Sequence, residues 1–143
     1  MSFTKDTSAG YLLNTLARLF ARELQTAIKP LGLSTGVFPA LLALWERDGR
    51  TQKELVAELG IEQATMANTL VRMERDKLVI RRGDETDGRV QRVWLTDRAK
   101  MLKDPAIHAA EAVNARALAG LPHADQERFL RMMQQVLRVM SEG

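Results

Sequence analysis

Apolar residues recur at intervals of three and four over the first part of the chain, which is the spacing of one face of an α-helix. From Tyr11 to Ile28 they fall at positions 12, 13, 16, 17, 20, 24, 27 and 28. The segment "KPLGLS" (29–34) then introduces a proline and a glycine, which stop helices. The pattern therefore predicts one long helix that ends near residue 28.

A second apolar run, "VFPALLALW" (37–45), predicts a second helix, and "RDGR" (47–50) ends it. Ser34 is the expected N-cap, because a serine side chain accepts hydrogen bonds from the free amides of a first helical turn. Pro39 is compatible with this helix only near its first turns, where its missing N–H is tolerated.

A short helix followed by a longer one is predicted between residues 51 and 77. Thr51 and Glu54 have the spacing of a capping box, and Gly60 stands where a helix C-terminus is expected. The next segment, "EQATMANTLVRMERDK" (62–77), carries three apolar residues at i, i+4 and i+7: Met66, Leu70 and Met73. Two helices joined by a glycine turn form either a helix-turn-helix or an ordinary αα-hairpin, and this pattern alone fits both.

The pattern changes from helical to β-rich after residue 77. The runs "LVIRR" (78–82) and "VQRVWL" (90–95) flank the turn-forming segment "GDETDG" (83–88), which predicts a two-stranded hairpin. An isolated hairpin is marginally stable in water, so this one must lean on the helices or on a partner. Thr96 is the expected N-cap of a fifth helix. The order helix, turn, helix, hairpin favours a winged helix-turn-helix.

A last helix is predicted after "GLPH" (120–123), and its apolar stripe consists of Phe129, Leu130, Met133, Val136, Leu137 and Met140. This helix and the first one have little to cover within so small a winged domain. We interpret them as dimerisation helices that cover each other across the two-fold axis of a homodimer. Packing of the last helix within a monomer is the alternative.

Composition fits one helix-rich domain. The chain has 143 residues, of which 45% are hydrophobic and 5% aromatic. It has no cysteine, which excludes disulfides and thiolate chemistry within the chain, and its two histidines are too few for a histidine metal cluster. We therefore expect no metal and no cofactor. The net charge of +3 gives only a weak attraction for polyanions.

The chain shows no membrane signal. Its longest apolar stretch, "FPALLALW" (38–45), is too short to cross a membrane, and the amino terminus lacks the basic-then-apolar pattern of a signal segment. We expect a cytoplasmic protein without a membrane partner.

Residues 51–96, "TQKELVAELGIEQATMANTLVRMERDKLVIRRGDETDGRVQRVWLT", resemble the winged helix-turn-helix of the MarR family of bacterial transcriptional regulators. The most specific pieces are "TMANTLVRMERD" (65–76) and the sequence Asp87-x-Arg89 followed by Leu95-Thr96. Many relatives have an arginine at the position of Thr86, a glycine at that of Lys77, and a serine or threonine at that of Glu62. The first departure removes a second wing arginine, and the other two fall at helix ends.

The resemblance extends more weakly over almost the whole chain and implies a single MarR-like domain over residues 1–143. The expected fold is mainly α with a small β-hairpin wing. A winged helix-turn-helix at about 33–100 would be flanked by dimerisation helices at about 10–30 and 104–141. The implied function is sequence-specific DNA binding by a homodimer that represses transcription at a palindromic operator.

Double-stranded DNA is the expected partner, and the segment 62–77 is the expected reading helix. A reading helix presents short polar or small side chains to base edges in the major groove. The start of the preceding helix offers free backbone amides to phosphates. The candidate DNA-binding residues are Thr51, Gln52, Gln63, Ala64, Thr65, Asn68, Arg72 and Arg89.

In the wing, the resemblance puts Arg89 near the minor groove or its phosphates. The alternative is an ion pair with Asp87 or Asp84 that only stiffens the loop, and both arrangements are compatible with each other. Three further arginines of the hairpin are expected to add non-specific attraction to phosphates: Arg81, Arg82 and Arg92.

Members of the MarR family often bind small aromatic acids between the dimerisation helices and the winged domain. The resemblance therefore implies a possible small aromatic or phenolic acid effector. Arg18 is the candidate partner for its carboxylate, and three residues are candidate walls or hydrogen-bond partners: Tyr11, Phe38 and His108. Each of the four also has an ordinary structural interpretation.

Two other classes of function are alternatives to a regulator. A small hydrolase using His108 or His123 lacks any nucleophile-and-base spacing, phosphate loop or metal motif. A helical protein-interaction module without DNA binding would more often expose apolar anchors than the polar Thr65-Asn68-Arg72 face. We expect a non-enzymatic DNA-binding regulator.

Overall fold

The computed structural model describes residues 2–142. Six α-helices, three strands and two short 3₁₀ helices follow one another in the order η1 (Lys5–Thr7), α1 (Ala9–Ile28), η2 (Lys29–Leu31), α2 (Phe38–Glu46), β1 (Arg50–Thr51), α3 (Gln52–Leu59), α4 (Gln63–Arg75), β2 (Val79–Gly83), β3 (Gln91–Leu95), α5 (Asp97–Leu118) and α6 (His123–Ser141). The fold is mainly α with a small antiparallel sheet, as predicted.

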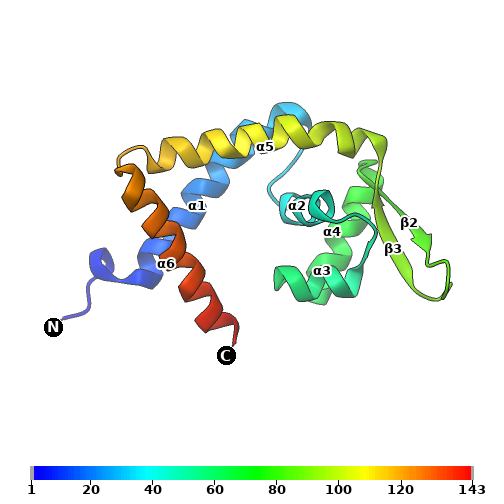
Figure 1. The fold of residues 1–143 in the computed structure, drawn as a ribbon, viewed down its shortest axis with the longest axis horizontal. Helices are drawn as coiled ribbons and strands as arrows, with labels where there is room; N and C mark the ends of the chain where they lie inside the picture. The colour runs from blue at the N-terminus through cyan, green and yellow to red at the C-terminus, as the bar shows by residue number, and fades with distance from the viewer. Residues whose placement is uncertain (1, 143) are drawn as a thin grey trace.

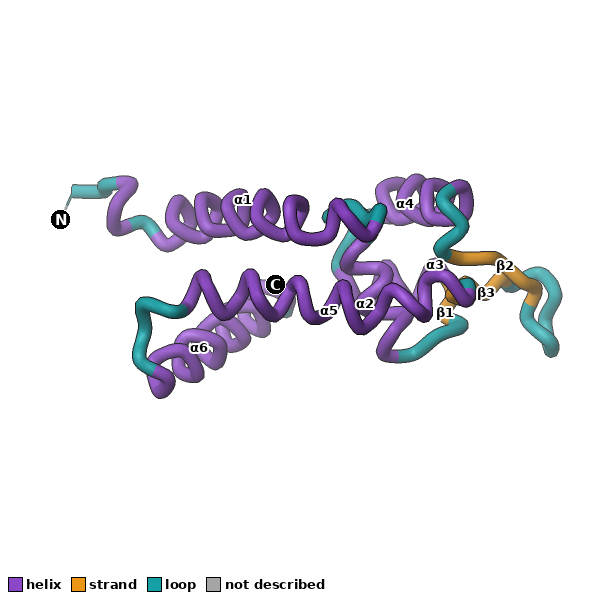
Figure 2. Tube along the Cα trace, turned by 90° about the horizontal axis from the view of Figure 1, so that it is seen from above, coloured by secondary structure: helices purple, strands orange, loops and turns teal. Residues whose placement is uncertain are grey.

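The helices form two groups joined by the long helix α5. Figure 1 shows α2, α3, α4 and the hairpin on one side of α5, toward its first half, and α6 near its far end. Seen from above, α1 and α5 run side by side, and α6 turns back from the end of α5 (Figure 2). The chain thus separates a winged unit from a helical arm.

The hydrophobic core lies in the winged unit. Its buried side chains come from α2, α3, α4 and the sheet, together with the end of α1 and the first half of α5, and include Ile28, Leu41, Leu44, Leu55, Met66, Leu70, Met73, Val79, Val93 and Ala106. None of the described residues of α6 is buried. The apolar spacing of Met66, Leu70 and Met73 thus identified the inward face of α4 correctly.

The start of α2 differs from the prediction. The helix begins at Phe38, and Ser34 is not its N-cap, because residues 35–37 form a turn that leads into it. A helix capped at Ser34 would place Pro39 beyond its first turn, where the missing N–H would leave a backbone carbonyl without its donor. Starting at Phe38 keeps Pro39 within the first turn.

The junction between α3 and α4 is a tight helix-turn-helix, as predicted. Thr51 Oγ1 accepts a hydrogen bond from the Glu54 amide, and the Glu54 carboxylate accepts one from the Thr51 amide, completing the capping box. Gly60 ends α3 with a φ of 64°, in the left-handed region that glycine tolerates best. Local capping therefore fixes where α3 starts and stops.

Helix α4 ends in a Schellman motif. The Leu78 amide donates to Met73 O at 2.8 Å and the Lys77 amide donates to Glu74 O at 3.0 Å. Lys77 has a φ of 60°. A glycine, which the family resemblance leads us to expect at this position, would adopt this conformation without strain.

The sheet contains one strand more than the predicted hairpin. Residues Arg50–Thr51 form β1, which pairs with β3, so the strand order is β1-β3-β2. Two residues are too short to show an alternating pattern, which is why the sequence did not reveal this strand. The hairpin therefore leans on the helical unit through β1.

Arg50 holds β1 against two helices. Its side chain is only 6% exposed, donates to Arg47 O at 3.1 Å and to Ala43 O at 3.0 Å, and forms an ion pair with Glu58 of α3. The guanidinium thus satisfies carbonyls at the end of α2 while its charge is paired. Its role is structural.

The prediction for α5 is confirmed at its start. Thr96 Oγ1 caps the helix by accepting from the Ala99 amide. The helix then continues through Pro105 to Leu118 without interruption. Trp45 Nε1 donates to Ala99 O at 3.0 Å, which attaches α5 to α2.

Candidate nucleic-acid interface

The outward face of α4 carries five of the predicted DNA-binding residues, and all five side chains are exposed: Gln63, Ala64, Thr65, Asn68 and Arg72. The opposite face is the core face of Met66, Leu70 and Met73, so the polar side chains lie outside the hydrophobic core. A shallow surface depression runs along the helix and is lined by Thr65, Asn68, Thr69, Val71, Arg72 and Arg75. The structure thus brings the predicted polar set together on one accessible surface.

Arg72 lies at the flank of this face. A Cβ added to Gly36 would lie 2.8 Å from Arg72 Nη2, so the guanidinium rests against the backbone of the turn before α2. Any larger residue at position 36 would displace it. Arg72 therefore reaches less directly outward than Asn68 in this arrangement.

Thr51, at the start of α3, was predicted to offer a free backbone amide to a phosphate, but in the structure this amide is already hydrogen-bonded. Both its hydroxyl and its amide take part in the capping box. The first-turn amides of Gln52 and Lys53 have no intrahelical acceptor by helix geometry, so these two amides, unlike that of Thr51, are not engaged within the helix. The Gln52 carboxamide donates to Gln63 Oε1 at 3.1 Å and so connects the two helices of the helix-turn-helix.

The wing is braced by a network around Asp84. Arg92 Nε donates to Asp84 Oδ1 at 2.6 Å, and Arg92 Nη1 donates to Gly49 O at 2.9 Å and to Glu54 Oε1 at 3.4 Å. The other oxygen of Asp84 accepts from the amides of Thr86 and Asp87 at 3.1 and 3.0 Å. One arginine therefore ties the hairpin to the start of α3.

These contacts change the proton affinities of the wing. The Arg92 guanidinium, followed by the Thr86 hydroxyl and the two loop amides, holds the pKa of Asp84 well below its ordinary value. The hydrogen bond from the Thr51 amide lowers the pKa of Glu54, to which Arg47 and Arg92 add. Asp84 and Glu54 are therefore both carboxylates at neutral pH.

The prediction that Arg81 and Arg92 attract phosphates is corrected by this geometry. Arg92 is bound to Asp84 and Glu54, and Arg81 Nε forms an ion pair with Glu74 of α4 at 2.8 Å. Both cations are thus paired with carboxylates of the same chain. These partners are seven or more positions away in the sequence, beyond what spacing reveals. Arg82 is exposed.

Arg89 is the most exposed cation of the wing tip, with 91% of its side chain accessible. Its Nε and Nη2 atoms donate to the Asp87 carboxylate at 3.1 and 3.4 Å. The predicted ion pair with Asp87 is therefore present, whereas Asp84 pairs with Arg92 instead. A pair this exposed holds the arginine only weakly, so it remains available to a polyanion.

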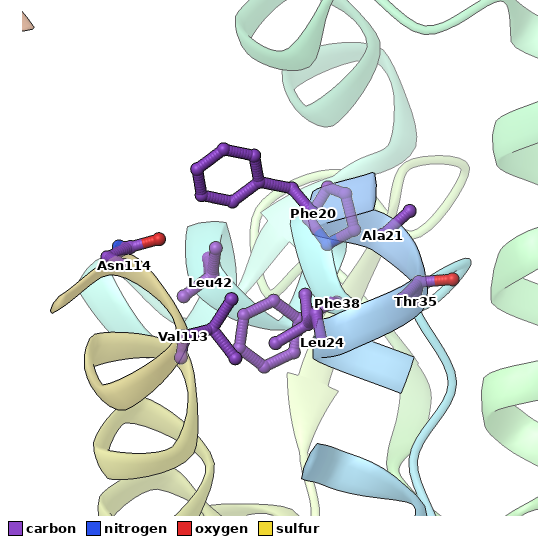
Figure 3. A pocket seen from close by; sticks show the side chains of 10 residues that line it. Phe20, Ala21, Leu24, Thr35, Phe38, Leu42, Val113 and Asn114 are labelled. Carbon is purple, nitrogen blue, oxygen red and sulfur yellow. The ribbon is translucent and has the colours of Figure 1, made fainter. Parts of the chain in front are cut away.

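The four predicted effector residues do not come together. A cavity of about 380 Å³ between α1, α2 and α5 is lined by Phe20, Ala21, Leu24, Thr35, Phe38, Pro39, Leu42, Ala110, Val113 and Asn114. Figure 3 shows Val113 and Asn114 of α5 across from Phe38 and Leu42 of α2. Of the predicted set, only Phe38 belongs to this lining. Tyr11, Arg18 and His108 are exposed elsewhere on α1 and α5.

Sequence reasoning passed over residues that belong to these sites. Val71 and Arg75 share the α4 surface, and Thr35 and Asn114 supply the polar groups of the cavity. The positions of Val71 and Arg75, seven and eleven residues after Ala64, were an available helical signal. Nothing in the spacing marks the cavity residues, because they come from three separate helices and from the turn before α2.

Neither a metal centre nor a membrane span is present within residues 2–142. No group of three His, Cys, Asp or Glu side chains there has an arrangement that could hold a metal ion. No described helix is both long and apolar enough to cross a bilayer.

Known proteins match the chain in both sequence and fold. The sequence profile of the MarR family matches residues 31–90, which contain the helix-turn-helix and most of the wing. The HTH-type transcriptional repressor Rv2887 of Mycobacterium tuberculosis is 29% identical over 136 residues, covering 95% of this chain and 98% of that protein. Residues 31–90 thus carry the sequence pattern of the MarR family.

Solved structures of MarR proteins have the same fold. The salicylic acid complex of Rv2887 superposes with a TM-score of 0.72 at 29% identity, covering 91% of this chain and 96% of that one. A putative MarR family regulator from Listeria monocytogenes, complexed with a 26mer DNA, gives a TM-score of 0.87 at 22% identity, covering 95% and 91%. The matched relatives named here are transcriptional regulators rather than enzymes.

Proposed function

We propose that this protein is a MarR-type repressor that binds a palindromic DNA operator as a homodimer. The observation that carries the proposal is the exposed polar face of α4 beside a wing whose tip presents Arg89. Figure 1 shows α3, α4 and the hairpin on the same side of α5. A reading helix and a cationic loop on one side match a major groove and the neighbouring backbone.

The DNA-bound relative from Listeria and the repressor Rv2887 support this proposal. The candidate base-reading residues are Gln63, Ala64, Thr65, Asn68 and Arg72. The candidate backbone contacts are the start of α3, including Gln52, and Arg89 in the wing. Thr51 serves this site by capping α3 and so orienting its first-turn amides toward a phosphate.

The homodimer is supported by apolar surface that the described chain leaves uncovered. On α1 it includes Leu12, Leu13, Leu16 and Leu19, and on α6 Leu130, Val136, Leu137 and Met140. Exposed apolar surface of this extent marks an association site. A two-fold pair would present two copies of α4 to successive major grooves.

The test is binding of the purified protein to its own promoter region and to random DNA over a range of salt concentrations. Promoter binding should be selective and should weaken steeply with salt, because contacts to phosphates release counterions. A protein-interaction module would show neither selectivity nor this salt dependence.

Substitutions locate the reading helix in the same assay. Asn68→Ala should weaken promoter binding by about 1–3 kcal/mol and relax specificity, since a bidentate amide contact to adenine is lost. Arg72→Ala should weaken it comparably. Arg22→Ala on α1 is the matched control for an exposed arginine and should change little. Wild-type promoter binding by both α4 variants would remove α4 from the reading role.

A small aromatic effector is the second part of the proposal, and the cavity between α1, α2 and α5 supports it. The lining offers aromatic and aliphatic side chains for a ring, and Thr35 and Asn114 for a hydroxyl or carboxyl group. None of its ten lining residues is charged, so an acid group would have to be bound by neutral donors or lie at the cavity mouth. Relative Rv2887 has been solved with salicylic acid.

Calorimetry with salicylic acid and its uncharged analogue salicylamide tests this assignment. Val113→Phe should abolish binding of both by filling the cavity, and Arg18→Ala should leave both unchanged. If Arg18→Ala alone removes salicylate binding, the carboxylate site is on the outer face of α1 instead.

A further inference from the structure

Val71 is the one large apolar side chain of α4 that is exposed, with 60% of its surface accessible. The other large apolar residues of this helix, Met66, Leu70 and Met73, are fully buried. Val71 lines the surface depression together with Asn68, Arg72 and Arg75. An apolar group thus sits in the middle of an otherwise polar surface.

Helix geometry puts Val71 at the centre of the outward face. Four exposed residues, Ala64, Asn68, Val71 and Arg75, are spaced i, i+4, i+7 and i+11 and therefore form one stripe along α4. Because each residue advances the helix by about 100°, this stripe lies directly opposite the buried face. Thr65 and Arg72 lie to one side of it.

Stability of the protein does not account for a valine here. The side chain contributes nothing to the core, and valine is a weaker helix former than alanine because its branched Cβ restricts its rotamers. Charged and polar neighbours also make this an unsuitable anchor for an apolar partner surface. An exposed valine at this position is better explained if it contacts a small apolar group of an otherwise polar ligand.

We infer that Val71 selects a thymine in each operator half-site by contacting its C5-methyl group. This inference rests on the proposed DNA binding. In the major groove the thymine methyl is the only apolar group displayed on a base edge, and small aliphatic side chains recognise it. Ala64, at the N-terminal end of the same stripe, provides a second methyl contact, and Asn68 between them suits an adenine.

The spacing of the stripe gives the spacing of the bases. Seven residues separate Ala64 from Val71, which is about 10 Å along the helix axis. With base pairs stacked about 3.4 Å apart, the thymine read by Val71 lies about three base pairs from the base that faces Ala64. The half-site should therefore be rich in A·T pairs over this interval.

Replacing thymine by uracil tests the inference because it removes the methyl group alone. The probe is a duplex that the full-length protein enriches from a random-centre library, with each half-site thymine replaced by uracil in turn. At the position that Val71 contacts, about three base pairs from the one facing Ala64, the parent protein should bind the uracil duplex roughly fourfold more weakly per half-site, the loss expected for one buried methyl contact. Val71→Ala should bind the thymine and uracil duplexes equally at that position.

Val90→Ala, at an exposed valine of the wing, is the matched control and should keep the parent's preference for thymine. Circular dichroism should show that Val71→Ala is as folded as the parent. If Val71→Ala keeps the parent's full thymine preference at every position, the inference is wrong while sequence-specific binding stands. If the library yields no enriched sequence, the proposed function fails, and the inference fails with it.

Discussion

Lys77 is the only non-glycine residue within 2–142 that has a positive φ, and it lies between the end of α4 and the first strand of the wing. A side chain in the left-handed region costs about 1 kcal/mol, which glycine avoids. We predict that Lys77→Gly stabilises the protein by about 1 kcal/mol in urea unfolding at fixed protein concentration. The hydrogen bonds of the Schellman motif should persist, because they use backbone atoms.

Arg75→Gly, two residues earlier, is the control for Lys77→Gly. It also removes a long basic side chain from the end of α4, but at a position with helical backbone, so it should destabilise by about 1 kcal/mol. If both glycines shift stability in the same direction, the effect of Lys77→Gly comes from lost charge and not from backbone strain.

Substitution of Arg89 should affect DNA binding without affecting the stability of the protein. Its ion pair with Asp87 is exposed, so Arg89→Ala should change the free energy of unfolding by less than about 0.5 kcal/mol. Promoter affinity should nevertheless fall substantially, and Arg89→Lys should restore only part of it, because an ammonium lacks the planar fork and sheds its water less readily. Fluorescence anisotropy with promoter DNA and urea unfolding measure the two effects.

Asp87→Asn distinguishes the two roles of Arg89. If Arg89 contacts DNA directly, weakening its intramolecular pair should leave affinity unchanged or raise it. An affinity loss as large as that of Arg89→Ala would identify the ion pair as a brace. Unfolding of Arg89→Ala would equally contradict a DNA-contacting role.

At the scale of elements, the wing depends on contacts that converge on Asp84. Its carboxylate orders the loop tip through the amides of Thr86 and Asp87, and Arg92 joins it to the rest of the protein. We predict that Asp84→Ala accelerates hydrogen exchange of these two amides and weakens promoter binding. Exchange at Leu70 in the core of α4 should be unchanged. Equal acceleration at Leu70 would mean that the wing and core unfold as one unit.

The same carboxylate predicts how the wing responds to pH. Because the pKa of Asp84 is lower in the folded than in the unfolded protein, its contribution is complete above the unfolded value of about 3.9 and is lost only as pH falls below it. After correction for intrinsic rates, protection of the Thr86 and Asp87 amides should be constant from about pH 7 to pH 5. A loss of protection near pH 6 would assign the loop's order to a different group.

Elements with strong local signals were predictable from sequence, and elements set by distant contacts were not. The capping box at Thr51, the stop at Gly60 and the cap at Thr96 are short-range patterns, and the structure confirms each of them. The two-residue strand β1 exists only because β3 pairs with it. For the same reason the pairing of Arg92 with Glu54, across 38 positions, could not be inferred from spacing.

The candidate site likewise has a part that local sequence patterns predict and a part that depends on distant contacts. The outward residues of α4 follow from helical periodicity, so the sequence alone predicts that Asn68 and its neighbours share the exposed face. The cavity proposed for an effector is assembled from three helices and the turn before α2, and of the four predicted residues only Phe38 lines it. Charge alone had suggested Arg18, but charge does not indicate which side of α1 faces a cavity.

At the scale of the whole molecule, stability and assembly use different surfaces. The core is confined to the winged unit and the adjoining parts of α1 and α5, and it includes no residue of α6. Leu137 of α6 is 64% exposed in the isolated chain. An exposed leucine at this place contributes to association and not to the fold of one protomer, if the proposed homodimer is correct.

Leu137→Glu should therefore produce a folded monomer. A buried carboxylate on both sides of a two-fold interface is doubly unfavourable, because each charge is desolvated and faces its symmetry mate. Sedimentation velocity should show a dimer for the parent and a monomer for the variant, with the same helix content by circular dichroism. Truncation after Leu121, which removes all of α6, should also abolish the dimer.

Met101→Glu on α5 supplies the control, because Met101 is 80% exposed and lies outside α1 and α6. This variant should remain dimeric. Promoter affinity should fall for Leu137→Glu although α4 and the wing are intact, since a monomer contacts one half-site and loses the second, tethered contact. A monomeric parent would contradict the homodimer outright, and a Leu137→Glu dimer would move the interface away from this face of α6. In either case, pairing of α1 and α6 across a two-fold axis could not be the reason why the protein binds two half-sites of a palindromic operator.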